Sequence, residues 1–351
     1  MIYAPVLLIT LCRFEELKNC IESLQSNSEA RYTDLYIGVD FPLKDSHREG
    51  YECILEYLNG GIEGFANICI IKQTENKGWY NNFVSVRQKI YEKYDRFIYL
   101  EDDIEVSPNF LAYMNKNLAV FEKDTDVQAI CGYSYPFEWM EDGSNLVKIN
   151  TYYTAWGYGT WKNKETEMYR AITMRNFDRI MHSPVQMRRF YKASNNQFCN
   201  FVKGMLEYIP VLVHNGKIVK LDMAFSVYIF MNHKYVIFPK RSKTRNVGCN
   251  GLGMNCEKIR IDPNKPATSR NYDYAFQPID LDENFEVIGA EKLDFREENN
   301  RRLGKFYPVE GRERFRTVLA YILYLILGRE LAKRVLGCGE FKPIRNRGKD
   351  E

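Results

Sequence analysis

The chain has 351 residues, long enough for one large domain or two smaller ones with a substantial core. Hydrophobic residues make up 45% and charged residues 27%, as in ordinary soluble globular proteins, and no repeat or low-complexity tract is present, which excludes repeat architectures. The net charge of +3 is unevenly distributed along the chain. Residues 301–351 hold 13 Lys/Arg and 6 Asp/Glu, so the remainder is mildly acidic and we expect no nucleic-acid partner.

The nine cysteines are scattered along the chain. Their number is odd, no CxxC pair occurs, and several lie in apolar runs. We therefore expect reduced thiols that pack as small core residues in a cytoplasmic chain. The first five residues hold no basic residue ahead of the apolar stretch, so we expect no signal peptide.

In chain order, short apolar runs alternate with helical patterns through the first 100 residues. Strands are predicted at 6–10, 35–39, 68–71 and 97–100, and helices at 17–24, 51–58 and 83–91. This alternation is typical of an α/β fold with a mostly parallel sheet flanked by helices.

Polar residues follow each of these predicted strands. In parallel α/β sheets the ligand binds outside the carboxyl ends of the strands, so these residues are expected to open onto one crevice. The candidate ligand-binding residues at the strand ends are Thr10, Arg13, Asp40, Lys77, Gly78, Glu101, Asp102 and Asp103.

The second half of the chain has a less regular pattern. Strands are predicted at 127–131 and 235–239, helices at 165–181, 186–206 and 222–232, and a glycine-rich loop at 246–253. Residues 261–311 are polar, contain prolines and show few apolar periods, so we expect an extended excursion there.

The acidic triplet at residues 101–103 directly follows an apolar run that predicts a buried strand. Carboxylates in such a place are costly unless a cation meets them. Mg²⁺ and Mn²⁺ are typically held by one or two carboxylates, with substrate phosphates completing the shell. The alternative is a solvated acidic turn. The neighbouring polar strand ends favour a metal site, with Asp103 as a ligand.

The first 135 residues resemble the nucleotide-sugar-binding half of GT-A-fold glycosyltransferases. Among these enzymes, the segment is similar to the inverting N-acetylglucosaminyltransferase that acts on mannose in N-glycans. It is also similar to bacterial glycosyltransferases that act in polysaccharide synthesis. The resemblance is carried by PVLLITLCRFEELKNCIESL, LYIGVDFP, ENKGWYNNFVSVRQKIY and YLEDDIEVSPNFLAYM, and the last, with the metal motif, is the specific one. It implies a Rossmann-like mixed sheet, with residues 1–135 binding the nucleotide-sugar and 136–260 the acceptor.

The resemblance also implies roles for individual residues. Asp103 would bind Mn²⁺ or Mg²⁺, Asp102 would support the nucleotide-sugar, Asp40 would read the base, and Arg13 would touch the nucleotide. The implied donor is a nucleotide-sugar, foremost a UDP-sugar. The metal would act as a Lewis acid on the leaving nucleotide. Cys12 stands where those enzymes often carry a polar residue.

An inverting transferase needs a carboxylate that deprotonates the acceptor hydroxyl. Asp222 stands among apolar residues at a predicted helix start, and in the similar enzymes such an Asp precedes a Pro and a polar loop, here Pro239 and its successors. The alternative is an Asp that stabilises the helix N-terminus by roughly 1 kcal/mol. Asp178, on a charged helical face, is the second candidate for the base.

Two further stretches are candidates for binding the donor or acceptor. TYYTAWGYGTW, residues 151–161, suggests that Trp156 and Gly157 lie beneath the sugars, as a Gly/aromatic turn does in the similar enzymes; a packed aromatic turn is the alternative. Lys240 and Arg241 precede the glycine-rich stretch and are expected to close over the diphosphate, unless they belong to a solvated basic loop.

The C-terminal residues 312–351 form a basic tail with an apolar centre. Its 11 uncharged residues, 317–327, fall short of the ~20 that cross a bilayer. A basic apolar helix can lie on anionic lipid, so we expect residues 312–337 to contact the inner membrane surface. A helix packed on the body or on a second subunit is the alternative.

Together these patterns predict a metal-dependent, inverting glycosyltransferase that transfers a hexosyl or N-acetylhexosaminyl group to a glycan or lipid-linked saccharide in bacterial surface polysaccharide synthesis. A nucleotidyltransferase is one alternative, but such enzymes usually carry a Gly-rich phosphate loop after the first strand, which TLCRFEEL lacks. A catalytically silent sugar- or lipid-binding scaffold is another, and the three aspartates at 102, 103 and 222 argue against it.

Overall fold

The structure is a computed structural model. It describes residues 3–136, 138–207, 213–214, 217–218, 221–248, 278–306 and 309–336. The part of the predicted glycine-rich loop after residue 248, the first half of the predicted excursion and the last residues of the tail lie outside this set.

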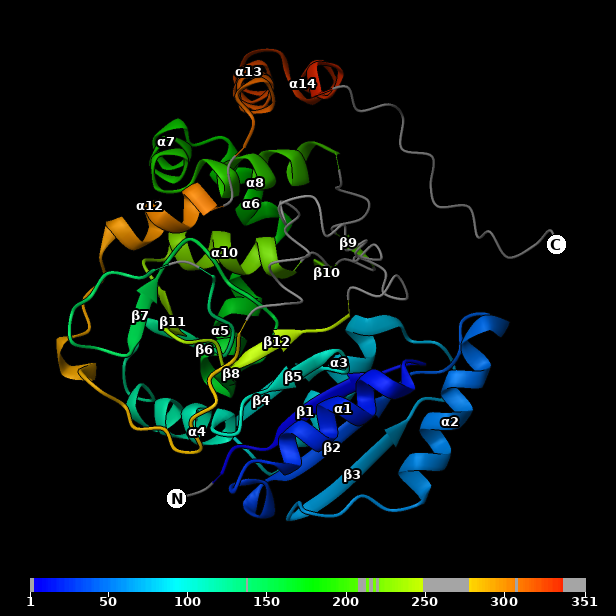
Figure 1. Cartoon of the computed structure of the whole chain (residues 1–351). Helices are drawn as coiled ribbons and strands as arrows, with labels where there is room; N and C mark the ends of the chain where they lie inside the picture. Colours follow the sequence, from blue (N-terminus) through cyan, green and yellow to red (C-terminus); the bar gives the residue numbers. More distant parts are fainter. Residues whose placement is uncertain are drawn as a thin grey trace, which may run out of the picture. The chain divides into compact units, whose positions relative to one another are not determined.

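The central feature is an eight-stranded sheet with the order β3-β2-β1-β4-β8-β6-β11-β7. Figure 1 shows β3, β2, β1 and β4 side by side in that order. The strands of this sheet are β1 (Val6–Thr10), β2 (Asp34–Val39), β3 (Asn67–Lys72), β4 (Arg96–Glu101), β6 (Val127–Cys131), β7 (Leu146–Ile149), β8 (Tyr158–Trp161) and β11 (Tyr235–Pro239).

The sheet is mixed and mostly parallel in its first half. β1 pairs in parallel with β2 and with β4, and β2 pairs in parallel with β3. β8 pairs antiparallel with β4 and with β6. The predicted α/β class, with a mixed, mostly parallel sheet flanked by helices, is confirmed.

Two compact units divide the chain. The first contains Met1–Lys148, Thr154–Lys164 and Ile237–Asp294, and the second contains Ile149–Tyr153, Glu165–Val236 and Phe295–Glu351. The helices of the first unit are η1 (Ala30–Tyr32), α1 (Phe14–Gln25), η2 (Asp45–His47), α2 (Arg48–Asn59), α3 (Gly78–Ile90), α4 (Phe110–Val120) and η3 (Ala290–Lys292).

Apolar periodicity explains why the first elements form where they were predicted. All five residues of β1 are buried, as expected of a central parallel strand covered on both faces. α1 buries one stripe at helical spacing, Leu17, Cys20, Ile21 and Leu24. β3, at the edge, is exposed at both ends.

Two stretches of the second unit, each predicted to form one long helix, instead form two shorter helices each. The stretch 165–181 forms α5 (Lys162–Ala171) and α6 (Met174–Met181), because the Thr173 hydroxyl accepts a hydrogen bond from the Asn176 N–H at 3.2 Å and starts a new helix. The stretch 186–206 forms α7 (Pro184–Ala193) and α8 (Asn195–Glu207), which are separated by the extended backbone of Ser194.

The other elements that the structure describes in the second unit are short strands and helices. They are β9 (Val213–His214), β10 (Lys217–Ile218), α10 (Leu221–Met231), α12 (Glu297–Phe306), α13 (Gly311–Leu327) and α14 (Arg329–Leu336). Gly328, at φ 84°, separates α13 from α14. Across the described stretches, none of the helices combines the length and the apolar character that crossing a bilayer requires.

A small second sheet joins two distant parts of the first unit. β5 (Ile104–Val106) pairs antiparallel with β12 (Thr244–Asn246), so Ile104 lies opposite Asn246 and Val106 opposite Thr244. Both strands have three residues, too few for a periodic signal, and neither was predicted as a strand. Their pairing brings residues 246–248 alongside the acidic turn that precedes β5.

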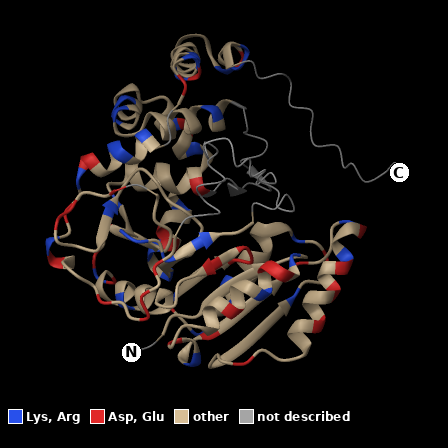
Figure 2. Cartoon of the chain, in the orientation of Figure 1, with Lys and Arg blue, Asp and Glu red and all other residues tan. Residues whose placement is uncertain are grey.

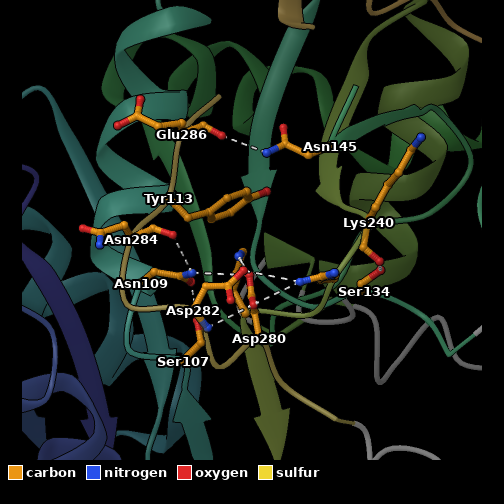
Figure 3. A network of polar contacts seen from close by, with 12 residues as sticks. Ser107, Asn109, Tyr113, Ser134, Asn145, Lys240, Asp280, Asp282, Asn284 and Glu286 are labelled. Carbon is orange, nitrogen blue, oxygen red and sulfur yellow. Dashed lines mark hydrogen bonds and ion pairs between the residues drawn. The ribbon is translucent and has the colours of Figure 1, made fainter. Parts of the chain in front are cut away.

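Residues 278–294 are largely irregular and are held to the first unit by buried contacts. Asp280 forms an ion pair with Lys243, and the amide of Asn109 donates to Asp280 Oδ2 at 3.3 Å and to the Asn284 carbonyl at 3.2 Å. Figure 3 shows Asn109, Asp280 and Asn284 converging in this network. Within the predicted excursion at 261–311, therefore, the described part is anchored and ends in the helix α12.

Candidate functional site

Asp102 and Asp103 form the turn between β4 and β5. Their residues are only 3% and 6% exposed. The apolar run before them forms a buried strand of the central sheet, so the chain emerges from the core directly at these two carboxylates. Buried ionised carboxylates require a counter-charge or several hydrogen bonds.

Arg13 supplies that counter-charge in this structure. Its Nη1 donates to Asp103 Oδ2 at 2.7 Å, and its Nη2 donates to Asp102 Oδ1. The arginine stands immediately before α1, and its side chain is 18% exposed. Burial lowers the pKa of Arg13, but the two adjacent carboxylates outweigh this and raise it, so the guanidinium is firmly charged.

Thr10, the last residue of β1, completes the environment of Asp102. Its hydroxyl donates to Asp102 Oδ2 at 2.8 Å, so both oxygens of Asp102 have partners. Burial raises the pKa of Asp102 to about 6, although Arg13 opposes this shift. The hydrogen bonds from Thr10 and Arg13 both favour the ionised form of Asp102.

Asp103 has one oxygen that remains without a partner. Its Oδ1 is buried and has no hydrogen bond to any residue that the structure describes. The Asp103 carbonyl accepts from the Val247 N–H at 2.9 Å, and a Cβ at position 248 would overlap with the Asp103 carboxylate. Gly248 thus permits the backbone after β12 to lie against the acidic turn. The sequence predicted Gly248 to lie in a glycine-rich loop, without a specific role. Its close approach to Asp103 depends on the pairing of β5 with β12, which was not predicted.

Asp40 connects two other strand ends to the same region. Its Oδ1 accepts from the N–H groups of Phe41 at 2.9 Å and Lys77 at 2.8 Å, and its own N–H donates to the Thr10 carbonyl at 3.0 Å. Gly78 follows with φ 70° and begins α3, while the Lys77 side chain is exposed. The polar ends of β1, β2 and β4 are thus brought together.

Glu101, the last residue of β4, accepts a hydrogen bond that the sequence did not indicate. The Tyr99 hydroxyl donates to Glu101 Oε1 at 3.0 Å and accepts from the Trp79 indole N–H at 2.7 Å. Burial raises the pKa of Tyr99 well above its ordinary value, so the hydroxyl stays protonated as a donor. Trp79 and Tyr99 therefore position Glu101.

Trp156 and Gly157 lie just before β8. Gly157 has φ 77°, and a Cβ there would stand 2.7 Å from Thr244 Cγ2, so only glycine is accommodated without strain. The Trp156 ring packs edge-on against Tyr133 with centroids 5.0 Å apart, and its carbonyl accepts from the Thr244 hydroxyl at 2.8 Å. This turn packs against the strand that also approaches Asp103.

Lys240 and Arg241 follow β11 and have acidic partners in the first unit. Lys240 Nζ lies 2.9 Å from Asp142 Oδ1. The exposed Arg241 lies 3.3 Å from Asp282 Oδ2. Figure 3 shows Lys240 and Asp282 beside the Asp280 network. No described contact joins either cation to Asp102 or Asp103.

Asp222 and Asp178 both belong to the second unit. Asp222 lies in the first turn of α10 with an exposed side chain, and its carbonyl accepts from the Ser226 hydroxyl at 2.9 Å. Asp178, on α6, accepts from the Tyr324 hydroxyl at 2.9 Å.

The acidic turn offers a divalent metal one protein oxygen that lacks a partner among the described residues. In the part of the chain that the structure describes, no group of three or more His, Cys, Asp or Glu residues is arranged to hold a metal ion. The partnerless Oδ1 of Asp103 is nevertheless a hard carboxylate oxygen of the type that Mg²⁺ and Mn²⁺ prefer. Such ions often take one or two carboxylates and complete their shell with substrate phosphates and water.

No family model matches the chain, and no curated protein matches it. Among solved structures it is similar to the mannosyltransferase PcManGT from Pyrobaculum calidifontis in complex with GDP-Man and Mn²⁺ (8% identity, 48% of this chain and 46% of that one, TM-score 0.32). It is also similar to the galactosyltransferase LgtC in complex with donor and acceptor sugar analogues (13% identity, 47% of this chain and 62% of that one, TM-score 0.27). A third similar structure is the UTP-bound UGPase from Acinetobacter baumannii (8% identity, 69% of this chain and 88% of that one, TM-score 0.34).

The match covers less than two thirds of the PcManGT and LgtC chains. Likenesses of this extent assign neither a family nor a function.

Proposed function

We propose that the chain is a metal-dependent, inverting glycosyltransferase of the GT-A type. It would move a hexosyl or N-acetylhexosaminyl group from a nucleotide-sugar, foremost a UDP-sugar, to a saccharide or lipid-linked acceptor. We further propose a role in bacterial surface polysaccharide synthesis at the cytoplasmic face of the membrane.

The observation that carries this proposal is the acidic turn after β4. Asp103 Oδ1, a buried carboxylate oxygen that has no partner among the described residues, lies beside an arginine whose fork matches both carboxylate and phosphate. Binding a diphosphate together with a hard cation would satisfy that oxygen and would place the charges of Arg13 and the metal on the leaving group. The sequence resemblance to GT-A enzymes centres on the same turn.

Each predicted residue has a proposed task. Asp103 would hold Mn²⁺ or Mg²⁺, which would supply Lewis-acid stabilisation of the departing nucleotide. Asp102, held by Thr10, would orient the donor, and Asp40 would read the base. The remaining proposed donor contacts are Lys77, Gly78, Glu101, Trp156, Gly157, Lys240 and Arg241.

Asp222 is proposed as the general base. Its side chain is exposed at the first turn of α10, where the unpaired N–H groups of the helix favour a negative charge. An ionised carboxylate there can accept the proton of an acceptor hydroxyl.

Replacing Asp103 by Ala is expected to abolish metal-dependent binding of a nucleoside diphosphate and to leave the fold intact. Isothermal titration of UDP and GDP with Mn²⁺ measures this affinity, and circular dichroism checks the fold. Asp95→Ala is the matched control, because Asp95 adjoins the opposite end of β4 and is exposed. Equal affinity for the Mn²⁺–nucleotide complex in wild type and Asp103→Ala would refute the metal role. Pyrophosphate release from UTP and a sugar 1-phosphate would favour a nucleotidyltransferase instead.

Membrane contact is proposed for α13. Phe315, Ile322 and Ile326 are exposed at spacings that place them on one face, opposite the buried Thr317, Ala320 and Tyr321. Figure 2 shows basic residues on α13 and α14. An apolar stripe with basic neighbours suits anionic lipid, because the apolar side chains can enter the interface while the arginines meet the headgroups.

Phe315→Ser combined with Ile326→Ser is expected to release the protein from anionic vesicles, since it removes the exposed apolar anchors. Flotation with phosphatidylserine-containing vesicles measures the bound fraction, and deletion of residues 312–351 should have the same effect. Leu281→Ser is the control, because Leu281 is an equally exposed apolar residue of the first unit. If the wild-type protein does not float, or if floating survives the changes on α13, this helix serves packing instead.

A further inference from the structure

The position of Arg13 has a consequence for how ligands reach the acidic turn. Its two terminal nitrogens engage Asp102 Oδ1 and Asp103 Oδ2, and Thr10 engages the other oxygen of Asp102. Of the four carboxylate oxygens, Asp103 Oδ1 is the one without a described partner. A divalent cation that binds there would lie close to a guanidinium of the same sign, and this repulsion weakens its binding.

A diphosphate removes that conflict. It brings negative charge for the cation and for the guanidinium, whose planar fork can leave a carboxylate for a phosphate with little loss of hydrogen bonding. Arg13 is suited to such an exchange. Its carbonyl is fixed by the Leu17 N–H at 3.0 Å at the start of α1, while its long side chain reaches the turn from a partly exposed position.

We propose that Arg13 is an exchangeable counter-ion of the acidic pair. In the free chain it forms ion pairs with both Asp102 and Asp103. When a nucleoside diphosphate binds, Arg13 transfers its hydrogen bonds to the phosphates and frees Asp103 for the metal. Metal and nucleotide therefore bind with positive coupling. This inference rests on the proposed nucleotide-sugar site, since it assigns the order and regulation of binding there.

The coupling has a defined thermodynamic form. If a diphosphate raises the affinity for the metal by some factor, the metal raises the affinity for the diphosphate by the same factor. Such factors typically lie between about 5 and 150. We expect a factor of at least about ten for wild-type protein, and a smaller factor once the competing guanidinium is absent, because only the direct attraction between metal and phosphates then remains.

Three variants test this on the full chain. Arg13→Gln removes the charge, and Arg13→Lys keeps it but cannot bridge two carboxylates as a planar fork does. Arg96→Gln is the matched control. Arg96 also contacts two carboxylates, those of Asp95 and Glu122, from the opposite end of β4, and its side chain is 16% exposed, close to the 18% of Arg13.

Binding of Mn²⁺ is measured by electron paramagnetic resonance, alone and with saturating UDP or GDP. For wild type and Arg96→Gln we expect weak binding of Mn²⁺ alone and at least about tenfold tighter binding with the nucleotide. For Arg13→Gln we expect tighter binding of Mn²⁺ alone, by about tenfold, and a smaller enhancement by nucleotide than in wild type, since the phosphates still supply ligands to the metal. Arg13→Lys should lie between them, and it keeps the test decisive should Arg13→Gln not fold.

The outcomes separate this inference from the proposed function. If wild-type protein binds neither UDP nor GDP with Mn²⁺, the proposed function fails, whereas the affinity of the Arg13 variants for Mn²⁺ alone still tests the competition. If wild type binds the metal–nucleotide complex but neither Arg13 variant binds Mn²⁺ alone more tightly than Arg96→Gln does, the exchange is wrong and Arg13 is a fixed structural partner.

Discussion

Replacing Asp222 by Asn is expected to lower the rate of sugar transfer by ~10²–10⁴-fold, the range typical of losing a general base. The amide keeps the shape of the side chain and can still accept a hydrogen bond at the start of α10, but it cannot take the proton of an acceptor hydroxyl. Affinity for a nucleoside diphosphate should be unchanged, because the candidate donor residues all belong to the other unit.

Single-turnover rate and melting temperature, measured on the same preparation, separate the chemical from the structural role of Asp222. If Asp222 is purely structural, Asp222→Asn removes only the favourable charge at the start of α10, which should lower stability by about 0.3–1 kcal/mol and leave the folded fraction active. Asp178→Asn is the control, since Asp178 is also an exposed carboxylate on a helix of the second unit. Near-normal transfer by folded Asp222→Asn would rule the residue out, and a loss in Asp178→Asn instead would make that residue the base.

Replacing Asp280 by Ala is expected to lower the free energy of unfolding by about 3–5 kcal/mol, because it leaves the ammonium group of Lys243 buried without its counter-ion. Lys243 is almost wholly buried, and its Nζ lies 4.8 Å from the centroid of the Phe285 ring. The ion pair also fixes the irregular segment 278–294, so its loss should release the contacts of Asn109 as well.

Urea denaturation of Asp280→Ala and Asp282→Ala compares a buried with an exposed carboxylate two residues apart. Asp282 pairs with the exposed Arg241, and its removal should cost at most about 1 kcal/mol. Burial lowers the pKa of Lys243 below its unfolded value. Asp280 opposes that shift, so its removal lowers the pKa of Lys243 further in the folded variant. Lys243 of the folded variant then loses its proton at a lower pH than in the wild type, so the Asp280→Ala deficit should narrow as the pH rises from 7 towards the ordinary lysine pKa of about 10.4. Equal losses in both variants would mean that the pair is not a significant anchor.

The strands that build the site could be predicted because they are continuous apolar runs. β1, β6 and β11 begin and end where the sequence pattern places them, and β2, β3 and β4 extend by at most a residue or two beyond it. The polar residues at the ends of these strands follow from the chain direction in a parallel sheet, which is why Thr10, Asp40 and Asp102 could be expected near one another.

What the sequence could not predict depends on contacts between distant residues. The partner of Asp102 and Asp103 is Arg13, about 90 positions away, and no local pattern marks that pairing. The three-residue strands β5 and β12 gain their stability from each other and carry no period of their own. The division of the predicted long helices arises from Thr173 and Ser194, whose effects on the backbone outweigh a continuous helical pattern.

The ion pairs of Arg13 with Asp102 and Asp103 also affect how the chain folds. In small zinc domains the ligand cysteines and histidines have no internal counter-charge, so folding waits for the metal and chelators denature the product. Here the positive charge that stabilises the buried aspartates is encoded in the chain itself, on the first residue before α1. We therefore expect the first unit to fold without any metal ion, so a chelator should leave its fold intact.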